Sequence, residues 1–395
     1  METERPIDRS LLSLILSGRL PEPDWESFSA ADWEALARLA QREEVAPLLY
    51  WSLSQSGRLG RLPGPLQASL RALYFGIRMK NEQSLKQLGR LASLLHRDRI
   101  PVVVLKGACF ALTIYPDIGL RPMADLDLLV PASRSAEAIR SARSLGYTDA
   151  VPEALPGLND LLSHAACLKK RDTPYTTLEV HHTLVADSSF THAVPADWFW
   201  SQTEPLKGTG LEDGSRHVRM LTPTAQLLYA CAHAMLQHGG RNTSLRWLYD
   251  LDRLIETYAG RIDWGLLVSQ ARAFEWSSAI SAALAETSAC FATRVPERVL
   301  EELSRQPDRN AARVRSLLSQ PATHTLEEYQ KLQSLDGYGR LRLTLALLMP
   351  TPAYMRWRYG LRSAWTLPGW YLYRWWGIFK DAVKTLWLIT HRRVS

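Results

Sequence analysis

The sequence has few cysteines and no long apolar run, and these absences exclude several classes of protein. The four cysteines are widely spaced and form no Cys-x-x-Cys pair. This argues against a disulfide framework or a zinc site and fits reduced thiols. No run of about 18 apolar residues is present to form a membrane-spanning helix. The first ten residues, METERPIDRS, lack the apolar core of a signal peptide. We therefore expect a cytoplasmic protein.

Motifs of two common enzyme classes are also missing. The chain has no Gly-x-Ser-x-Gly elbow, which argues against a Ser/His/Asp hydrolase of the α/β type. It has no Walker A lysine turn, and we find no repeats or low-complexity segments. A length of 395 residues, of which 46% are hydrophobic and 22% charged, fits a globular protein of two or more modules.

The positive charge is concentrated at the C-terminal end of the chain. Residues 340–395 hold ten Lys or Arg and one acid, a net charge of +9, so the preceding residues carry −2 of the total of +7. A nucleic-acid-binding protein would be basic over more of its length, so we do not expect nucleic acid as the main partner. The same tail contains six of the fourteen tryptophans, interleaved with arginine. Three interpretations stay open: a buried helical bundle with surface arginines, a helix on a membrane surface, or a single-strand nucleic-acid binder.

Helical patterns lie on both sides of a central mixed region. Ser29 stands three residues before Asp32 and an apolar repeat follows, which predicts a capped helix. Leu or Ile recurs every three or four residues over much of 66–97, which predicts one long helix. From Thr222 onward we expect helices, with Pro223 at the first helical position. These later helices are expected at 222–238, ended by Gly239-Gly240, at 244–258 and, as one or two helices, at 264–293.

Residues 101–185 alternate between strand and helix patterns. A β-branched run over 101–106 stops at Gly107, which predicts a strand that ends in a tight turn. Ser133 is a plausible N-cap for a helix over 133–145. The remaining expected elements are a helix at 108–115 and strands at 125–130, 146–149, 164–170 and 176–182.

Asp125 and Asp127 stand at the head of one of these strands. Side chains at i and i+2 of a strand point to the same face, roughly 6–7 Å apart. Two carboxylates so placed repel each other unless a cation lies between them, and hard cations such as Mg²⁺ take oxygen ligands. The alternative is a helix cap or a solvated pair of loop acids. On the strand at 176–182, Thr177, Glu179 and His181 share a face in the same way.

Four segments together resemble the nucleotidyltransferase superfamily of DNA polymerase β, and more closely its branch of uncharacterised nucleotidyltransferase family proteins, often found beside bacterial biosynthetic genes. They are LKGA at 105–108, YPDIGLRPMADLDLLV at 115–130, LEVHH at 178–182 and HAMLQH…LRWLYDLDRLI at 233–255. The resemblance implies an α+β fold whose core is a small mixed sheet. We expect this core at 65–185, between an N-terminal helical region at 1–64, a C-terminal helical domain at 186–339 and the tail at 340–395.

The resemblance also implies a reaction. It is the transfer of a nucleoside monophosphate from a nucleoside triphosphate (NTP) to a hydroxyl or phosphate, with Mg²⁺ or Mn²⁺ as cofactor. Such transfer depends on positioning and on metal ions that neutralise the developing charge. Asp125, Asp127 and Glu179 are the implied metal ligands and catalytic residues, and the alternative for Glu179 is an exposed strand acid without a role in the reaction. The acceptor can be a small molecule, a peptide or a protein. The alternative is a nucleotide-binding scaffold without turnover.

Four further residues are candidates for binding the nucleotide. Lys106 and Gly107 lie where a strand turns into a helix, a position that suits phosphate, and the alternative is a tight turn with a surface lysine. His181 can position phosphate or metal, or be structural. Arg121 can pair with the triphosphate or hold its own loop. One departure from the superfamily stands beside them, because Ala108 replaces the serine of its Gly-Ser turn.

The resemblance places a cap over the cleft, formed by the helices after residue 222. Its candidates for recognising base or acceptor are His233, His238, Arg246 and Asp250. Arg246 and Asp250 are four residues apart, so a surface ion pair is the simpler explanation for these two. Asp117, beside Pro116, is expected to form a turn.

Overall fold

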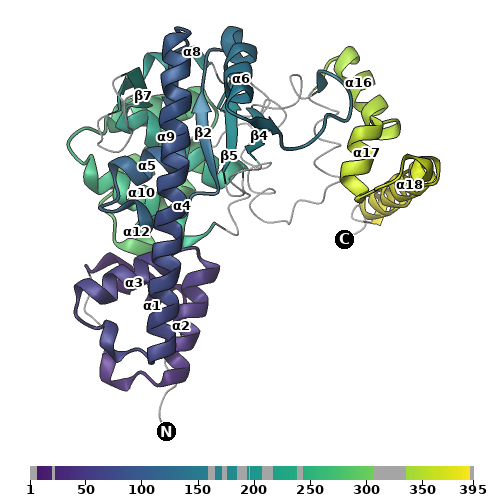
Figure 1. The fold of residues 1–395 in the computed structure, drawn as a ribbon. Helices are drawn as coiled ribbons and strands as arrows, with labels where there is room; N and C mark the ends of the chain where they lie inside the picture. The colour runs from purple at the N-terminus through teal and green to yellow at the C-terminus, as the bar shows by residue number, and fades with distance from the viewer. Residues whose placement is uncertain are drawn as a thin grey trace.

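The computed structural model describes residues 7–19, 23–158, 165–170, 176–184, 194, 196–206, 217–237, 243–305 and 335–391, with side chains to residue 381. Helices surround a single seven-stranded sheet of mixed direction. The fold is therefore α+β, with helices before and after the sheet, as expected. The long helix α4 (Gly64–Arg97) runs from the N-terminal helices up to the sheet (Figure 1).

The N-terminal helices are short and begin at recognisable caps. Ser29 and Asp32 form a capping box, in which the Ser29 amide donates to the Asp32 carboxylate at 2.9 Å and the Asp32 amide donates to the Ser29 hydroxyl at 3.3 Å. This confirms the predicted helix start. The elements before the sheet are α1 (Arg9–Ser17), η1 (Trp25–Ser27), α2 (Ala30–Arg42), α3 (Ala46–Gln55), η2 (Leu59–Arg61) and α4.

The sheet has the strand order β3-β4-β5-β2-β1-β7-β6. Two neighbouring pairs are parallel, β2 with β5 and β1 with β7, and the other described pairs are antiparallel. The strands are β1 (Val102–Val104), β2 (Asp125–Leu129), β3 (Tyr147–Asp149), β4 (Ala165–Lys170), β5 (Thr177–His181), β6 (Thr203–Pro205) and β7 (Val218–Leu221). The last two were not predicted, and they extend the sheet past residue 185, where the core was expected to end.

The helices between and after the strands follow the predicted pattern with one correction. Ser133 is not the N-cap of a helix, because it lies inside the 3₁₀ turn η4 (Ala132–Arg134) and α6 begins two residues later. The expected helix stop at 239–240 lies outside the described residues. The other elements are α5 (Lys106–Thr113), η3 (Ile118–Leu120), α6 (Ser135–Ser144), α8 (Ala196–Ser201), α9 (Pro223–Ala232), the π-helical η7 (His233–Gln237), α10 (Leu245–Thr257), α11 (Trp264–Ala273), α12 (Ser277–Phe291), α13 (Glu297–Ser304), α16 (Gly337–Leu348), α17 (Pro352–Tyr359), η8 (Ala364–Thr366) and α18 (Leu367–His391).

Successive residues of the central strands face two separate cores. Val102 and Val104 belong to a cluster with the second half of α4 and with α6. Val103 and Leu129 belong to a larger cluster that joins the N-terminal helices to α9, α10 and α12. Because alternate residues of a strand share a face, Asp125 and Asp127 lie on the Leu129 side. The sheet thus presents its carboxylates toward the helical domain.

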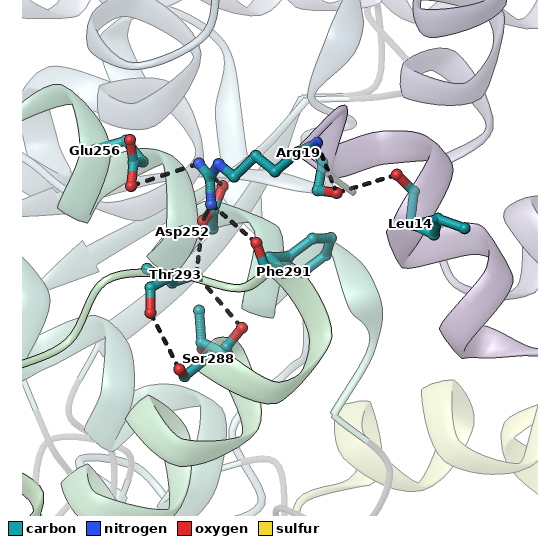
Figure 2. A network of polar contacts seen from close by, with 9 residues as sticks. Leu14, Arg19, Asp252, Glu256, Ser288, Phe291 and Thr293 are labelled. Carbon is teal, nitrogen blue, oxygen red and sulfur yellow. Dashed lines mark hydrogen bonds and ion pairs between the residues drawn. The ribbon is translucent and has the colours of Figure 1, made fainter. Parts of the chain in front are cut away.

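A partly buried polar network connects the N-terminal helices to the C-terminal ones (Figure 2). Arg19, just after α1, binds both carboxylate oxygens of Asp252 on α10, with Nη1–Oδ1 2.7 Å and Nη2–Oδ2 3.2 Å. Its Nη1 also donates to the carbonyl of Phe291 at 2.9 Å, and the hydroxyl of Thr293 donates to Asp252 at 2.6 Å. Asp252 is buried. Its charge is balanced only while the two helical regions stay together.

The tail helices α16, α17 and α18 form an arm beside the main body (Figure 1). Thr351 joins the arm to the loop after β3, with its amide donating to the Ala154 carbonyl at 2.8 Å and its hydroxyl to the Glu153 carbonyl at 2.7 Å. The interpretation of the tail as a buried bundle is wrong, because many of its large apolar side chains are exposed, with Trp365 at 94%. Among the described residues, no helix has the length and apolar character needed to cross a bilayer.

Candidate functional site

The register of two parallel strands brings the predicted acids together. On β2 and β5, Asp127 pairs with Glu179 and Asp125 pairs with Thr177. Leu129 pairs with His181 in the same ladder. Paired residues of parallel strands point to the same face of the sheet. The two predicted strands are confirmed, and their candidate residues share one face.

Asp127, Glu179 and His181 converge on a small volume. Their ligand atoms all lie within 4.8 Å of one another. His181 Nε2 is 2.8 Å from Asp127 Oδ1 and 3.3 Å from Glu179 Oε2. Asp127 and His181 are buried, whereas the Glu179 side chain is 28% exposed. Two carboxylates and an imidazole that open to solvent on one side make a donor set that a divalent cation can use.

Lys106 also binds Asp127. Its Nζ lies 3.1 Å from Asp127 Oδ1, and the ring centre of Tyr229 is 5.7 Å away. Burial lowers the pKa of Lys106, but Tyr229 and the carboxylates of Asp127 and Glu179 outweigh burial and raise that pKa above its ordinary value. Lys106 has φ +38°, a backbone conformation that non-glycine residues rarely adopt. The structure therefore places this lysine on the acid cluster, at the start of α5.

Asp125 and Asp127 have opposite electrostatic surroundings, although they are two residues apart. Burial, followed by the charges of Asp127 and Glu179, raises the pKa of Asp125 to about 6. Burial acts in the same direction on Asp127, but Lys106 and His181 outweigh it and hold the pKa of Asp127 well below its usual range. For His181, burial lowers the pKa, while hydrogen bonds to Asp127 and Glu179 raise it to a larger extent. Asp125 is not a member of the group of three, yet it lies close enough to feel the charge of that group.

Arg121 is held by a residue that is distant in sequence. Its Nε and Nη2 donate to the two carboxylate oxygens of Asp250 at 3.0 and 2.8 Å, and its Nη1 donates to the Pro122 carbonyl at 3.2 Å. The Tyr115 hydroxyl donates to the same carboxylate at 2.7 Å. These contacts support the loop-holding interpretation of Arg121, and a role in nucleotide binding stays a prediction.

Gly107 is required by the position of Arg121. A Cβ atom on Gly107 would lie 2.7 Å from Arg121 Nη1, which is closer than real Cβ contacts come. The glycine thus allows the guanidinium to pack directly on the first turn of α5. The turn that carries Lys106 is thereby coupled to Asp250 on α10.

Arg246 and Asp250 of the predicted cap do not form a surface ion pair with each other. That interpretation is wrong, because Asp250 is buried and bonded to Arg121. Arg246 instead pairs with Glu44 at 3.0 Å, and its Nη1 donates to the Pro122 carbonyl at 2.9 Å. The ring of His233 contacts the rings of Tyr229 and Trp247 edge-on, with centroids 6.1 and 5.9 Å apart. His238 lies outside the described residues.

Sequence reasoning missed the contribution of α4 to this site. Asn81 is buried, and its Nδ2 donates to the carbonyls of Ile118 and Arg121 at 2.5 and 2.8 Å. Burial lowers the pKa of the neighbouring Lys80, and the charge of Asp125 acts in the opposite direction, so this lysine lies near that carboxyl. The signal was present in the sequence, because polar residues 80–82 interrupt the apolar repeat of the helix.

The same helix also fixes the turn before Arg121. Asp117 caps η3 by accepting from the Gly119 amide at 2.7 Å, which confirms it as a turn former. Arg78 on α4 pairs with Asp117 at 2.9 Å. A Cβ on Gly119 would lie 2.8 Å from Arg78 Cβ and 2.9 Å from the Tyr74 ring, so this glycine lets the turn pack against α4.

Comparison with known proteins gives one match. A family model described as "Uncharacterised nucleotidyltransferase" matches residues 29–292. No curated protein and no solved structure shows significant similarity to the chain. The matched span runs from the N-cap of α2 to the residue after α12. It therefore includes the acid cluster, Lys106 and the Arg121–Asp250 pair, and it ends before the tail helices.

Proposed function

The chain belongs to the uncharacterised nucleotidyltransferase family, whose model covers more than half of its length; from this premise we propose that it transfers a nucleoside monophosphate from an NTP to a hydroxyl or phosphate, with Mg²⁺ or Mn²⁺. The observation that carries the proposal is the register that sets Asp127 against Glu179, with both in reach of His181. The acceptor is a small molecule, a peptide or a protein.

The donor chemistry of the cluster fits a divalent ion. Carboxylate oxygens suit Mg²⁺ and Mn²⁺, and an imidazole favours Mn²⁺ over Mg²⁺. Asp127, Glu179 and His181 would hold the ion, with Asp125 as a further ligand from the same face of β2. A bound ion supplies positive charge that neutralises a triphosphate and its leaving group.

Individual side chains in and around the cluster would bind the phosphate, accept a proton and support the loop. Lys106 carries a positive charge at the start of α5, where a phosphate oxygen would be attracted both by the ammonium and by the helix N-terminus. The Glu179 side chain is 28% exposed whereas Asp127 is buried, so an acceptor hydroxyl can reach the Glu179 carboxylate, which can take its proton. Arg121, held by Asp250, supports the loop before β2 and the turn at Gly107, and its pairing with the triphosphate stays a prediction.

A nucleotide-binding scaffold without turnover is the second candidate. One observation favours it, because Lys106 and His181 already neutralise Asp127 in the absence of metal. Ala108 in place of the superfamily serine points the same way. A protein of this kind would bind NTP in a manner that ignores divalent ions and survives the loss of Asp125.

The test is a transfer assay with NTPs labelled at the α-phosphate, Mg²⁺ or Mn²⁺, and extract from the host as a source of acceptors. Wild type is expected to move label into an acceptor and release pyrophosphate. Asp127→Ala should abolish both signals, while Asp149→Ala, which removes an exposed acid outside the site, should not. Equal incorporation by wild type and Asp127→Ala, or none with any NTP, would remove the catalytic proposal. Calorimetry then tests the scaffold candidate, by measuring whether NTP binding ignores divalent ions and survives the loss of Asp125.

A further inference from the structure

The exposed apolar side chains of this protein are concentrated on the arm formed by its tail helices. Twelve of the sixteen large apolar side chains that are exposed among the described residues lie between residues 338 and 379. We name this set the tail surface: Tyr338, Leu341, Leu345, Leu348, Met349, Trp357, Trp365, Leu372, Tyr373, Trp375, Trp376 and Phe379. We propose that the tail surface docks on an anionic lipid membrane, with the tail helices lying along the plane of the headgroups.

The arm is built so that one face of α18 is occupied and another is left open. Arg374 Nε donates to the Leu347 carbonyl at 2.8 Å, and Trp375 Nε1 donates to the Leu348 carbonyl at 2.6 Å. The Tyr371 hydroxyl donates to the Pro350 carbonyl. These bonds fix α18 to the end of α16 through its polar atoms, so the helix keeps a defined orientation while other side chains of its described part, to residue 381, are exposed to solvent.

The open side of α18 has the periodicity of a surface helix. Leu372, Trp376 and Phe379 are spaced i, i+4 and i+7, which places them on one face, and all three are more than half exposed. On α16, Tyr338, Leu341 and Leu345 have the same kind of spacing. Exposed apolar patches that are rimmed by polar residues often mark sites that bind a protein or a membrane.

The charge of the arm selects the partner. Exposed basic residues flank the apolar stripes on every element of the arm: Arg340, Arg356, Arg358, Arg362 and Lys380. The segment 340–395 carries +9 with a single acid. Arginine beside tryptophan and leucine matches a headgroup layer, where phosphates meet the upper part of the acyl chains. A second copy of this chain fits less well, because it would bring +9 against +9.

The membrane so bound would lie beside one edge of the sheet. Thr351 joins the arm to the loop after β3, and β3 is the first strand in the sheet order. Docking of the arm does not involve the acid cluster, which is on β2 and β5. The inference therefore goes beyond the proposed transfer reaction and stands or falls separately from it.

The experiment is sedimentation of the full chain with vesicles at low salt. One set of vesicles is phosphatidylcholine alone, and the other is phosphatidylcholine and phosphatidylserine in equal parts. Wild type is expected to pellet with the second set and to be released as salt is raised, because headgroup attraction is screened. The triple variant Arg356→Gln, Arg358→Gln, Arg362→Gln should bind roughly a hundredfold more weakly, at about fivefold for each basic residue near the surface.

Matched controls separate the tail surface from general effects. A triple variant of the main body, Arg38→Gln, Arg97→Gln and Arg305→Gln, removes the same amount of charge. It should pellet with the vesicles like wild type. Trp365→Ser, Trp376→Ser, Phe379→Ser should lose binding at least as strongly as the charge variant. A second control removes three exposed apolar side chains from α4, by Leu73→Ser, Phe75→Ser and Met79→Ser. This variant should still pellet with the vesicles.

Three results would overturn the proposal. The first is the absence of pelleting with phosphatidylserine vesicles at low salt. The second is equal pelleting of wild type and both tail variants. The third is self-association, or binding of single-stranded nucleic acid, that the aromatic variant abolishes while vesicles are ignored.

Discussion

Asp127 and Glu179 lie directly opposite each other on two parallel strands and approach the same nitrogen of His181. A single proton on Nε2 cannot form two well-aligned hydrogen bonds to both carboxylates at once. A divalent ion at this point would interact with all three groups, so the cluster could serve as a ligand set. The arrangement depends on the register of β2 and β5, and a shift by one residue would turn one strand's acids to the other face.

We expect Mn²⁺ to stabilise the protein through this cluster. An ion present at a hundred times its dissociation constant adds about 2.7 kcal/mol to the free energy of unfolding. Glu179→Gln should abolish the shift of the thermal midpoint with Mn²⁺, whereas Glu34→Gln, an exposed acid on α2, should keep it. An unchanged shift in Glu179→Gln would show that the ion binds elsewhere. The measurement is thermal unfolding with and without the ion.

Asp125→Asn and Asp127→Asn are expected to change stability in opposite directions in the metal-free protein. With a pKa of about 6, Asp125 is harder to ionise in the folded protein than in the unfolded chain. Its charge therefore costs stability above pH 6, and Asp125→Asn should gain about 1–2 kcal/mol there. The gain should vanish below about pH 4, where the carboxyl is protonated in both states.

For Asp127 the sign is reversed. Its pKa is depressed by Lys106 and His181, so its charge stabilises the fold above about pH 4, and this contribution is lost as the pH falls further. Asp127→Asn removes the carboxylate that Lys106 and the buried His181 share and should cost about 3–5 kcal/mol at neutral pH. Denaturant unfolding of both variants across pH measures the two effects, and equal signs would contradict the surroundings described for the two acids.

The Arg121–Asp250 pair is expected to be a strong structural contact. Both side chains are buried, so Asp250→Asn leaves an arginine charge unbalanced in the interior and should lower the free energy of unfolding by about 3–5 kcal/mol. The exposed pair Arg143–Asp149 has similar distances and is the matched control, for which Asp149→Asn should cost no more than about 1 kcal/mol. An equal loss of unfolding free energy in Asp250→Asn and Asp149→Asn would mean that burial does not strengthen the Arg121–Asp250 pair.

Three glycines should respond to alanine in different ways. Gly107→Ala meets Arg121 Nη1, and Gly119→Ala meets Arg78 and Tyr74, so each should destabilise by about 1–3 kcal/mol. Gly76, inside α4, has open space where a Cβ would be, and Gly76→Ala should stabilise by about 0.5–1 kcal/mol. Urea unfolding of the three variants decides the order. A stabilised Gly107→Ala would show that Arg121 is free to move.

The local features of the site could be read from the sequence, because they depend on near neighbours. The strand run before Gly107, the two acids of β2 and the shared face of Glu179 and His181 follow from the alternation of side chains along a strand. The capping box of Ser29 follows equally from a spacing of three residues. Each prediction needed only residues that lie within one element.

The parts that failed depend on contacts between distant residues. Asp250 was expected to pair with Arg246, four residues away, but its partner is Arg121, 129 residues away. β7 was missed because Val218–Leu221 is short and its place beside β1 is set by packing, which no spacing in the sequence reveals. The register that opposes Asp127 to Glu179 is likewise a property of the assembled sheet.

The place of β7 has a consequence for synthesis on the ribosome. β1 pairs with β2 on one side and with β7 on the other, and β7 is translated long after β1, β2 and β5. Until residue 221 has left the ribosome, one edge of β1 lacks its backbone hydrogen-bond partners. Such open edges can pair with other nascent chains. A shortened gene that stops near residue 185 would leave that edge open for good. The smallest fragment that contains the acid cluster and does not aggregate must therefore extend past Leu221.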